Sequence, residues 1–220
     1  MSELLQSIVL DTGPNPQTSI IWLHGLGADG HDFEPVANEL RLPGAVRYIF
    51  PHAPMCPVTI NGGFVMRAWY DIAEMDIAAQ QDEAGIRDSQ AKVEALIRRE
   101  TERGIPPNRI FLAGFSQGGA IALHTALRQT RPLAGVLALS TYLPLSAQAA
   151  QEMLPGTQST PVFMAHGLSD TVIPHSLGRA SADALTTLGY RVDWHEYPMA
   201  HSVCDAELRD LERWLAARMD

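Results

Sequence analysis

Cysteine is scarce in this sequence, because Cys56 and Cys204 are the only two among its 220 residues. Two thiols are too few for a disulfide framework in a chain of this length, and they indicate a reducing compartment. Basic residues are also few, with 16 lysines and arginines against 25 acids and a formal net charge of −9. Nucleic acids and anionic membrane surfaces are bound by basic patches, so we expect neither as a partner.

Long apolar runs are absent as well. No stretch approaches the roughly 20 apolar residues that cross a bilayer, and residues 1–10 lack the basic and apolar regions of a signal peptide. We therefore expect a soluble, cytoplasmic protein without a transmembrane segment. Hydrophobic residues make up 46% of the chain and charged residues 19%, which allows a large core. Since there is no internal repeat or long linker, residues 1–220 are expected to form one domain.

The most informative stretch is a Gly-x-Ser-x-Gly motif at residues 114–118, with Ser116 at its centre. The apolar run 110–113 before it predicts a buried strand, and the Ala- and Leu-rich stretch 119–128 after it predicts a helix. Strand, sharp turn and helix form the context of a nucleophile elbow, in which a serine is exposed at the tip of a strained turn. A plain turn between strand and helix is the alternative for the motif taken alone.

The glycines of the motif explain why such a turn is possible. Gly114 and Gly118 have no Cβ atom, so strand and helix can pass close to each other around a serine with positive φ. The N–H of Gln117 would then point into the same space as the Ser116 hydroxyl, at the start of a helix whose dipole favours negative charge.

Along the rest of the chain, short apolar runs alternate with helical patterns. The other predicted strands are residues 7–10, 19–23, 46–50, 133–139, 161–165 and 191–197. The other predicted helices are residues 33–42 with Asp32 as N-cap, 82–103, 177–188 and 205–218. Residues 52–64 are expected to be a long loop and residues 141–155 a connection. The alternation predicts an α/β fold with a mostly parallel central sheet, helices on both faces and strands 7–10 and 191–197 at the edges.

A serine hydroxyl needs a base, and in an open α/β sheet the base lies beyond the carboxyl ends of the strands. Among eight histidines, His201 fits best because it follows the last predicted strand. His24 and His166 also end strands, and we interpret them as hydrogen-bonded structural residues. Asp170 follows a strand as well and can orient the base. The chain order Ser116, Asp170, His201 is that of α/β-hydrolases, in which the histidine acts first as base and then as acid.

Acyl transfer at such a serine also requires two hydrogen-bond donors for the oxyanion. One donor is the Gln117 N–H, next to the serine. The other is expected from the loop that follows the strand 19–23, and we assign it to the Leu26 N–H.

These residues are part of a larger set of motifs in one order. The chain resembles the bacterial carboxylesterases of the phospholipase/carboxylesterase family, which are relatives of the acyl-protein thioesterases. The resemblance covers nearly the whole chain, and one departure is Pro198 and Ala200, where relatives often carry glycine before the histidine. The matching motifs are His24-Gly25-Leu26-Gly27, Pro51-His52-Ala53-Pro54 with Pro57-Val58-Thr59, Trp69-Tyr70-Asp71, Gly104-Ile105-Pro106, the elbow with Gly119, His166-Gly167 with Asp170, and Met199-Ala200-His201.

The resemblance implies a serine carboxylesterase that hydrolyses small or medium-chain esters through an acyl-enzyme intermediate. The family triad falls on Ser116, Asp170 and His201, and the family oxyanion donors fall on Leu26 and Gln117. The implied partner is a small-molecule ester or thioester, with neither a cofactor nor a metal.

The resemblance also implies a flexible segment that lines an acyl channel and matches roughly residues 72–79. Ile72, Met75 and Ile77, with Val172 nearby, are the apolar candidates for this pocket, and ordinary packing is the alternative for each. Exposed apolar residues in the same segment would permit a homodimer.

Several other functions stay open on the sequence alone. Acyl-protein thioesterases and lysophospholipases use the same acyl-enzyme chemistry and differ in pocket depth, which the sequence does not show. A non-catalytic ligand-binding homologue is a different class, and the complete set of Ser, Asp and His speaks against it. A metal site at His195, His201 and Cys204 lacks the spacing of known zinc motifs. Peptidases of this fold commonly carry a further domain, for which the chain has no room.

Overall fold

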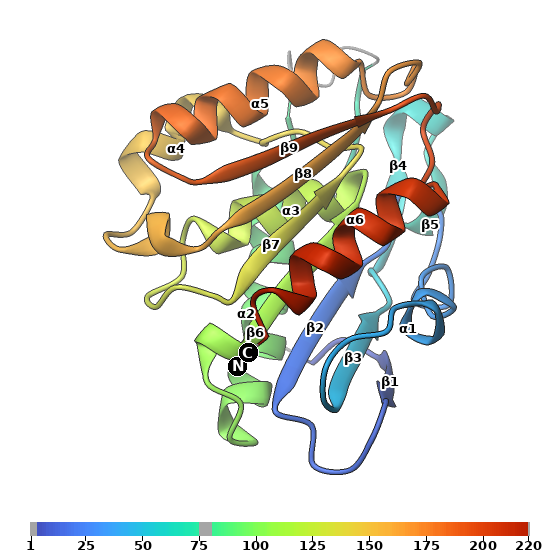
Figure 1. The fold of residues 1–220 in the computed structure, drawn as a ribbon. Coiled ribbons are helices and arrows are strands. Elements are labelled where there is room, and N and C mark those ends of the chain that lie inside the picture. The colour runs from blue at the N-terminus through green and yellow to red at the C-terminus, as the bar shows by residue number, and fades with distance from the viewer. Residues whose placement is uncertain (1–3, 75–80, 220) are drawn as a thin grey trace.

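The computed structural model describes residues 4–74 and 81–219. Seven strands in these two ranges form one sheet in the order β1-β3-β2-β6-β7-β8-β9 (Figure 1). All neighbours are parallel except β1, which is antiparallel to β3 at one edge. The predicted α/β architecture with a mostly parallel sheet is therefore confirmed. The strands are β1 Ser7–Asp11, β2 Thr18–Leu23, β3 Val46–Pro51, β6 Ile110–Phe115, β7 Gly135–Leu139, β8 Val162–Gly167 and β9 Val192–Tyr197.

Helices cover both faces of this sheet. Two hydrophobic clusters divide them, with α1 and α6 packed on one face and α2, α3, α4 and α5 on the other. In Figure 1, α6 crosses the face turned toward the viewer. No helix in the described ranges is long and apolar enough to cross a membrane. The helices are α1 Val36–Glu39, α2 Glu83–Glu102, α3 Gln117–Ala126, α4 Ser146–Glu152, α5 His175–Thr187 and α6 Asp205–Ala216.

The central strands are apolar along their whole length because both of their faces are covered. In β2, Ile20 and Trp22 pack toward α1 and α6, whereas Ile21 and Leu23 pack toward α2 and α3. Successive side chains of a strand point to opposite faces, so a strand buried on both faces shows a continuous apolar run instead of alternation. On the α6 side, Trp214 packs edge-on against aromatic rings of β6 and β8.

The helix predicted at residues 33–42 is wrong in length and in its cap. Only Val36–Glu39 is α-helical, and the residue before it is Pro35, not Asp32. The preceding residues form successive turns with bonds between residues three apart, such as Val36 N–H to Phe33 O at 3.1 Å. Pro35 cannot donate a main-chain hydrogen bond, and Pro43 favours extended backbone at the residue before it. The two prolines therefore limit the length of a regular helix in this segment.

Two stretches predicted without regular structure also contain elements. The expected loop 52–64 overlaps an antiparallel hairpin, with β4 Met55–Val58 and β5 Phe64–Arg67 joined by the 3-10 turn Thr59–Asn61. Gly62 and Gly63 both have positive φ at its turn. The expected connection 141–155 contains α4. Further 3-10 turns lie at Pro107–Arg109 and Thr157–Ser159.

Candidate active site

Ser116 lies between β6 and α3 in the strained turn that its motif predicts. Its φ is 54° and its ψ −123°, so the predicted positive φ is confirmed. A Cβ on Gly114 would come within 2.4 Å of the Gly118 carbonyl carbon, and one on Gly118 within 2.3 Å of Leu23 O. These distances are far below van der Waals contact. Only glycine at both positions lets β6, β2 and α3 approach this closely.

Hydrogen bonds from the neighbouring strand hold the strained turn in place. The Ser116 N–H donates to Leu139 O at 2.9 Å, and the Thr141 hydroxyl donates to Ser116 O at 2.7 Å. Both partners lie at or just beyond the end of β7. Main-chain bonds on both sides of the serine therefore fix the direction of its side chain, and the strain in φ is maintained by its surroundings.

The side chain of Gln117 joins the elbow to the segment around residues 69–70. Its Oε1 accepts from the Trp69 N–H at 2.8 Å, and its Nε2 donates to Tyr70 O at 2.7 Å. Trp69 Nε1 in turn donates to His24 O at 2.9 Å. All of these groups are buried. The elbow, the loop after β2 and the segment before α2 are thereby fixed to one another.

The structure brings Ser116, His201 and Asp170 together in one hydrogen-bonded series. Ser116 Oγ lies 2.9 Å from His201 Nε2, and His201 Nδ1 lies 2.7 Å from Asp170 Oδ2. The other carboxylate oxygen of Asp170 accepts from the N–H groups of Val172 and Ile173, both at 2.9 Å. Since a carboxylate only accepts, His201 carries its hydrogen on Nδ1, and Nε2 is free to accept from the serine hydroxyl.

The turn before His201, which contains Pro198 and Ala200, is held by main-chain hydrogen bonds. Met199 O accepts from the Ser169 N–H at 3.0 Å, and the Ser202 N–H donates to Ala200 O at 3.0 Å. A Cβ on Gly167 would lie only 2.3 Å from Ala200 O, so this turn packs directly on the end of β8. The close contact with β8 holds the histidine over the sheet without glycine in the turn itself.

His24 is a buried, hydrogen-bonded structural residue in the loop after β2, as the sequence predicts. Its Nδ1 donates to Gly25 O at 2.7 Å, and its Nε2 accepts from the Ala53 N–H at 3.0 Å. These partners require the neutral ring, and burial lowers the pKa of His24 to about 4. The ring therefore braces the start of residues 24–27 without carrying charge.

His166 is likewise a buried structural residue, and it lies beside Asp170. Its Nε2 donates to Ile173 O at 2.9 Å and lies 3.4 Å from Asp170 Oδ2. The ring is fully buried, and that burial lowers the pKa of His166 below its ordinary value. The prediction that this histidine is a hydrogen-bonded structural residue is confirmed.

The two expected oxyanion donors lie on the wall of the pocket that contains Ser116. Leu26 and Gln117 both line it, and neither main-chain N–H donates to any residue in the ranges 4–74 and 81–219. The next N–H groups of the loop are used, since that of Gly27 donates to Arg67 O at 2.9 Å. The Leu26 and Gln117 donors are thus available to an oxygen atom of a bound molecule.

The pocket beside Ser116 has a volume of about 270 Å³ and is mainly apolar. Ile72 and Val172, two of the predicted acyl-pocket residues, line it. Met75 and Ile77, the other two, lie outside the described residues. Tyr142, which the sequence reasoning missed, also contributes to the wall. Its position a few residues beyond the carboxyl end of a central strand is the signal that could have identified it.

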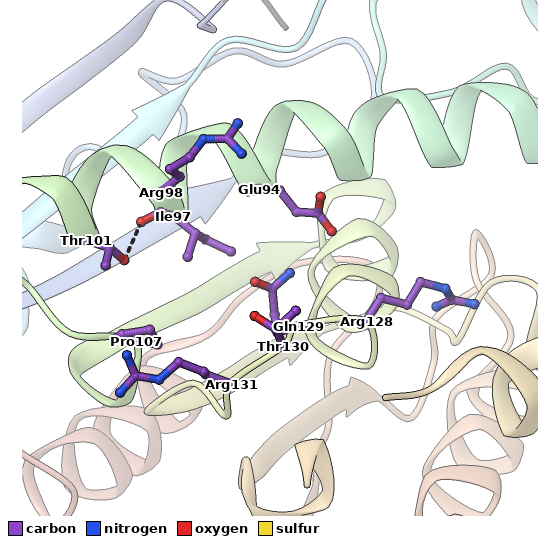
Figure 2. Close-up of a pocket in the computed structure, with 9 residues that line it drawn as sticks. All are labelled: Glu94, Ile97, Arg98, Thr101, Pro107, Arg128, Gln129, Thr130 and Arg131. Atoms are coloured by element: carbon purple, nitrogen blue, oxygen red, sulfur yellow. Dashed lines mark hydrogen bonds between the residues drawn. The ribbon is translucent and has the colours of Figure 1, made fainter. Parts of the chain in front are cut away.

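A second pocket of about 430 Å³ lies between α2 and residues 128–131 after α3. Figure 2 shows that the side chains of Arg98, Arg128 and Arg131 at its rim point in different directions. Arg128 is already bound, because its Nε donates to Glu152 at 3.0 Å and its Nη1 to His124 O at 2.9 Å. The three arginines of the larger pocket therefore do not converge, whereas Ser116 and His201 of the smaller pocket are hydrogen-bonded to each other.

Comparison with known proteins gives matches along most of the chain. A family model described as Phospholipase/Carboxylesterase matches residues 6–219. An acyl-protein thioesterase 1 from Neurospora crassa is 42% identical over 213 residues, covering 91% of this chain and 86% of that protein. A probable carboxylesterase from Oryza sativa subsp. japonica is 36% identical, covering 89% of this chain and 76% of that protein. These relatives are fungal and plant proteins, so the expected resemblance to bacterial members in particular is not supported.

Solved structures give the same picture of the fold. The crystal structure of Arabidopsis thaliana SOBER1 is similar with a TM-score of 0.88 and 31% identity, covering 92% of this chain and 99% of that chain. The crystal structure of Zea mays acyl-protein thioesterase 2 has a TM-score of 0.87 and 28% identity, covering 98% of this chain and 99% of that one. The α/β-hydrolase fold is therefore shown.

Proposed function

Because the chain belongs to the phospholipase/carboxylesterase family, we propose that it is a serine hydrolase that cleaves acyl thioesters and esters through an acyl-enzyme. The observation that carries this proposal is the pair of hydrogen bonds joining Ser116, His201 and Asp170, 2.9 and 2.7 Å long. Both lengths lie in the range that a nucleophile and its base need for proton transfer.

In the first half of the reaction, His201 Nε2 takes the hydroxyl proton while Ser116 Oγ attacks the carbonyl carbon of the substrate. The carbonyl oxygen gains negative charge, which the N–H groups of Leu26 and Gln117 stabilise. His201 then gives its proton to the leaving sulfur or oxygen, so that a thiol or an alcohol departs. Asp170 accepts the Nδ1 hydrogen throughout and stabilises the charged ring.

In the second half, a water molecule replaces the thiol or alcohol. His201 removes a proton from this water, whose oxygen attacks the acyl carbon bound to Ser116. The second oxyanion uses the same two donors, and the returning proton restores the serine hydroxyl as the carboxylic acid leaves. Both halves use the same side chains and main-chain donors, and the second half adds one water molecule.

Among the candidate substrates, acyl thioesters are better supported than the small esters that the sequence reasoning favours. Relatives named acyl-protein thioesterase match at 42% and 41% identity. A carboxylesterase of shorter acyl chains is the second candidate. Its support is the pocket volume of about 270 Å³, below the roughly 300–1,000 Å³ typical of small-molecule sites, together with the rice relative named a probable carboxylesterase.

One experiment separates these candidates. A short peptide carries an octanoyl group either on a cysteine sulfur or on a serine oxygen, and release of octanoic acid is measured for both. We expect cleavage of both peptides, faster for the thioester, and none with the Ser116→Ala variant. Cleavage of the oxygen ester alone would favour the carboxylesterase. Binding of both peptides without any cleavage would contradict the proposal and favour a non-catalytic homologue.

A further inference from the structure

Two tyrosines from separate segments meet in the wall of the serine pocket. Tyr70 precedes α2 and Tyr142 follows β7, and their hydroxyl oxygens lie 2.7 Å apart. Their side chains are buried, with exposures of 3% and 2%. Burial raises the pKa of Tyr142 to about 12 and that of Tyr70 well above its ordinary value. Both phenols are therefore protonated at neutral pH, and the pair holds two hydroxyl hydrogens.

Only one of these two hydrogens is used between the tyrosines. A hydrogen bond between two phenols consumes one O–H, so one hydrogen of the pair needs a different acceptor. Neither hydroxyl bonds to any other residue within 4–74 and 81–219. A buried donor without an acceptor is costly, so an acceptor atom on a molecule bound in the pocket that both rings line would stabilise the remaining hydrogen.

The pair is fixed to the same turn that carries the nucleophile. Tyr70 O accepts from Gln117 Nε2 at 2.7 Å, and Thr141, next to Tyr142, donates its hydroxyl to Ser116 O at 2.7 Å. Tyr70 itself is thus bonded to the elbow, and Tyr142 is bonded to it through the adjacent residue Thr141. These two bonds fix the position of the pair relative to Ser116.

The wall around the pair suits an acyl chain. Ile72 lies two residues from Tyr70, and Ile173 and Val172 also line the pocket. An alkyl chain that passes along this wall would make apolar contacts with these side chains but would leave the phenol hydrogen without an acceptor. An oxygen atom on the chain would accept that hydrogen and keep the apolar contacts of its carbon atoms.

We propose that Tyr70 and Tyr142 determine acyl specificity, and that the site prefers acyl groups bearing a hydrogen-bond-accepting oxygen on the chain, such as oxo acids, over alkyl chains of equal length. This inference rests on the proposed function at Ser116. It concerns only which acyl group is transferred fastest.

The test uses p-nitrophenyl heptanoate and its oxo derivatives, with the oxo group moved along the chain one carbon at a time. Rates are corrected for hydrolysis without protein, and the ratio of kcat/KM for each oxo ester to that for heptanoate is measured. We expect wild type to show a maximum at one oxo position. The double variant Y70F/Y142F should lower that maximum about threefold to tenfold, as expected for one lost hydrogen bond.

Further variants keep the test decisive. Each single variant, Tyr70→Phe or Tyr142→Phe, leaves one phenol that can still donate, so at least one of them should retain the preference. Tyr48→Phe is the matched control, because Tyr48 is equally buried but packs on the opposite face of the sheet, and it should leave every ratio unchanged. A flat series in wild type, or an unchanged maximum in a folded double variant, would overturn the proposal. Absence of all hydrolysis in wild type would instead reject the proposed function.

Discussion

Two pockets lie at opposite ends of α3, and they differ in how their polar side chains are arranged. The pocket at the N-terminal end of α3 is the smaller, about 270 Å³, and it is lined by Ser116 and His201, which are hydrogen-bonded to each other, and by Leu26 and Gln117. The pocket beyond the C-terminal end is larger, about 430 Å³, and three arginines surround it. The proposed reactive site is therefore identified by its hydrogen-bonded polar groups and not by its volume.

The direction of α3 accounts for this difference. Its N-terminus presents free N–H groups and the positive end of the helix dipole, which favour an oxyanion. Its C-terminus presents carbonyl groups, and Arg128 Nη1 donates to one of them, His124 O, while Gln129 Nε2 donates to Thr125 O at 3.1 Å. Cationic side chains stabilise that end of a helix. Arg128 and Gln129 at this pocket thus have structural roles that need no ligand.

The largest expected effect comes from Asp170→Asn at the serine pocket. An amide in place of the carboxylate favours the wrong tautomer of His201, so that Nε2 carries the hydrogen and cannot accept from Ser116. We expect kcat for an ester substrate to fall about 10⁴-fold, with thermal stability near that of wild type. Asp183→Asn, an exposed site on α5, is the control and should be neutral. A loss smaller than tenfold in the folded variant would show that Asp170 does not orient the base.

The second effect concerns the loop after β2, which contains the proposed oxyanion donor at Leu26. Leu26→Pro removes the main-chain N–H, whereas Leu26→Ala removes only the side chain and keeps that donor. We expect kcat to fall about 10²–10³-fold for the proline variant and only slightly for the alanine variant. Equal losses in both variants, measured on protein with wild-type circular dichroism, would point to the side chain and away from the main-chain donor.

The third effect concerns stability at acid pH. The folded pKa of His24 is about 4, whereas an unfolded histidine titrates near pH 6.5. As pH falls from 6.5 to 4, the unfolded state gains a proton that the folded state does not, so this histidine lowers the free energy of unfolding by about 3 kcal/mol. Urea unfolding at several pH values measures this loss. His24→Gln should flatten the dependence in that window, and an identical slope in both proteins would contradict the assignment.

The smallest expected effect belongs to the arginine-lined pocket. Arg98 and Arg131 are both exposed, and neither has an ion-pair partner in the described ranges. The double variant R98A/R131A should therefore keep kcat/KM for the same ester within about twofold of wild type, as surface substitutions usually do. A tenfold change would mean that the two ends of α3 are coupled, and the contrast between them would have to be abandoned.

Much of the sheet and of the site could be predicted from the sequence because their signals are local. The buried strands are continuous apolar runs, the elbow is a contiguous motif, and Asp170 and His201 each follow a strand. The hairpin β4–β5 was missed because Pro57 and two glycines resemble a loop, although proline is compatible with the edge of a two-stranded sheet. The helix α4 was missed between Pro144 and Pro155, despite good helix formers in between.

The polar contacts between distant segments could not be predicted in the same way. The bond between the hydroxyls of Tyr70 and Tyr142 joins residues 72 positions apart, and the two bonds from the Gln117 side chain span 48 and 47 positions. No periodicity or short motif carries such pairings. They depend on how the loops at the carboxyl ends of the strands pack against one another.

The most direct test of the whole account is the reaction of Ser116 itself with a fluorophosphonate, which labels activated serines covalently. Mass spectrometry of the labelled, digested protein should place the adduct on Ser116 in wild type. The folded variant Ser116→Ala should take up no label and hydrolyse no ester above background. Labelling at another serine, or undiminished ester hydrolysis by Ser116→Ala, would contradict the account.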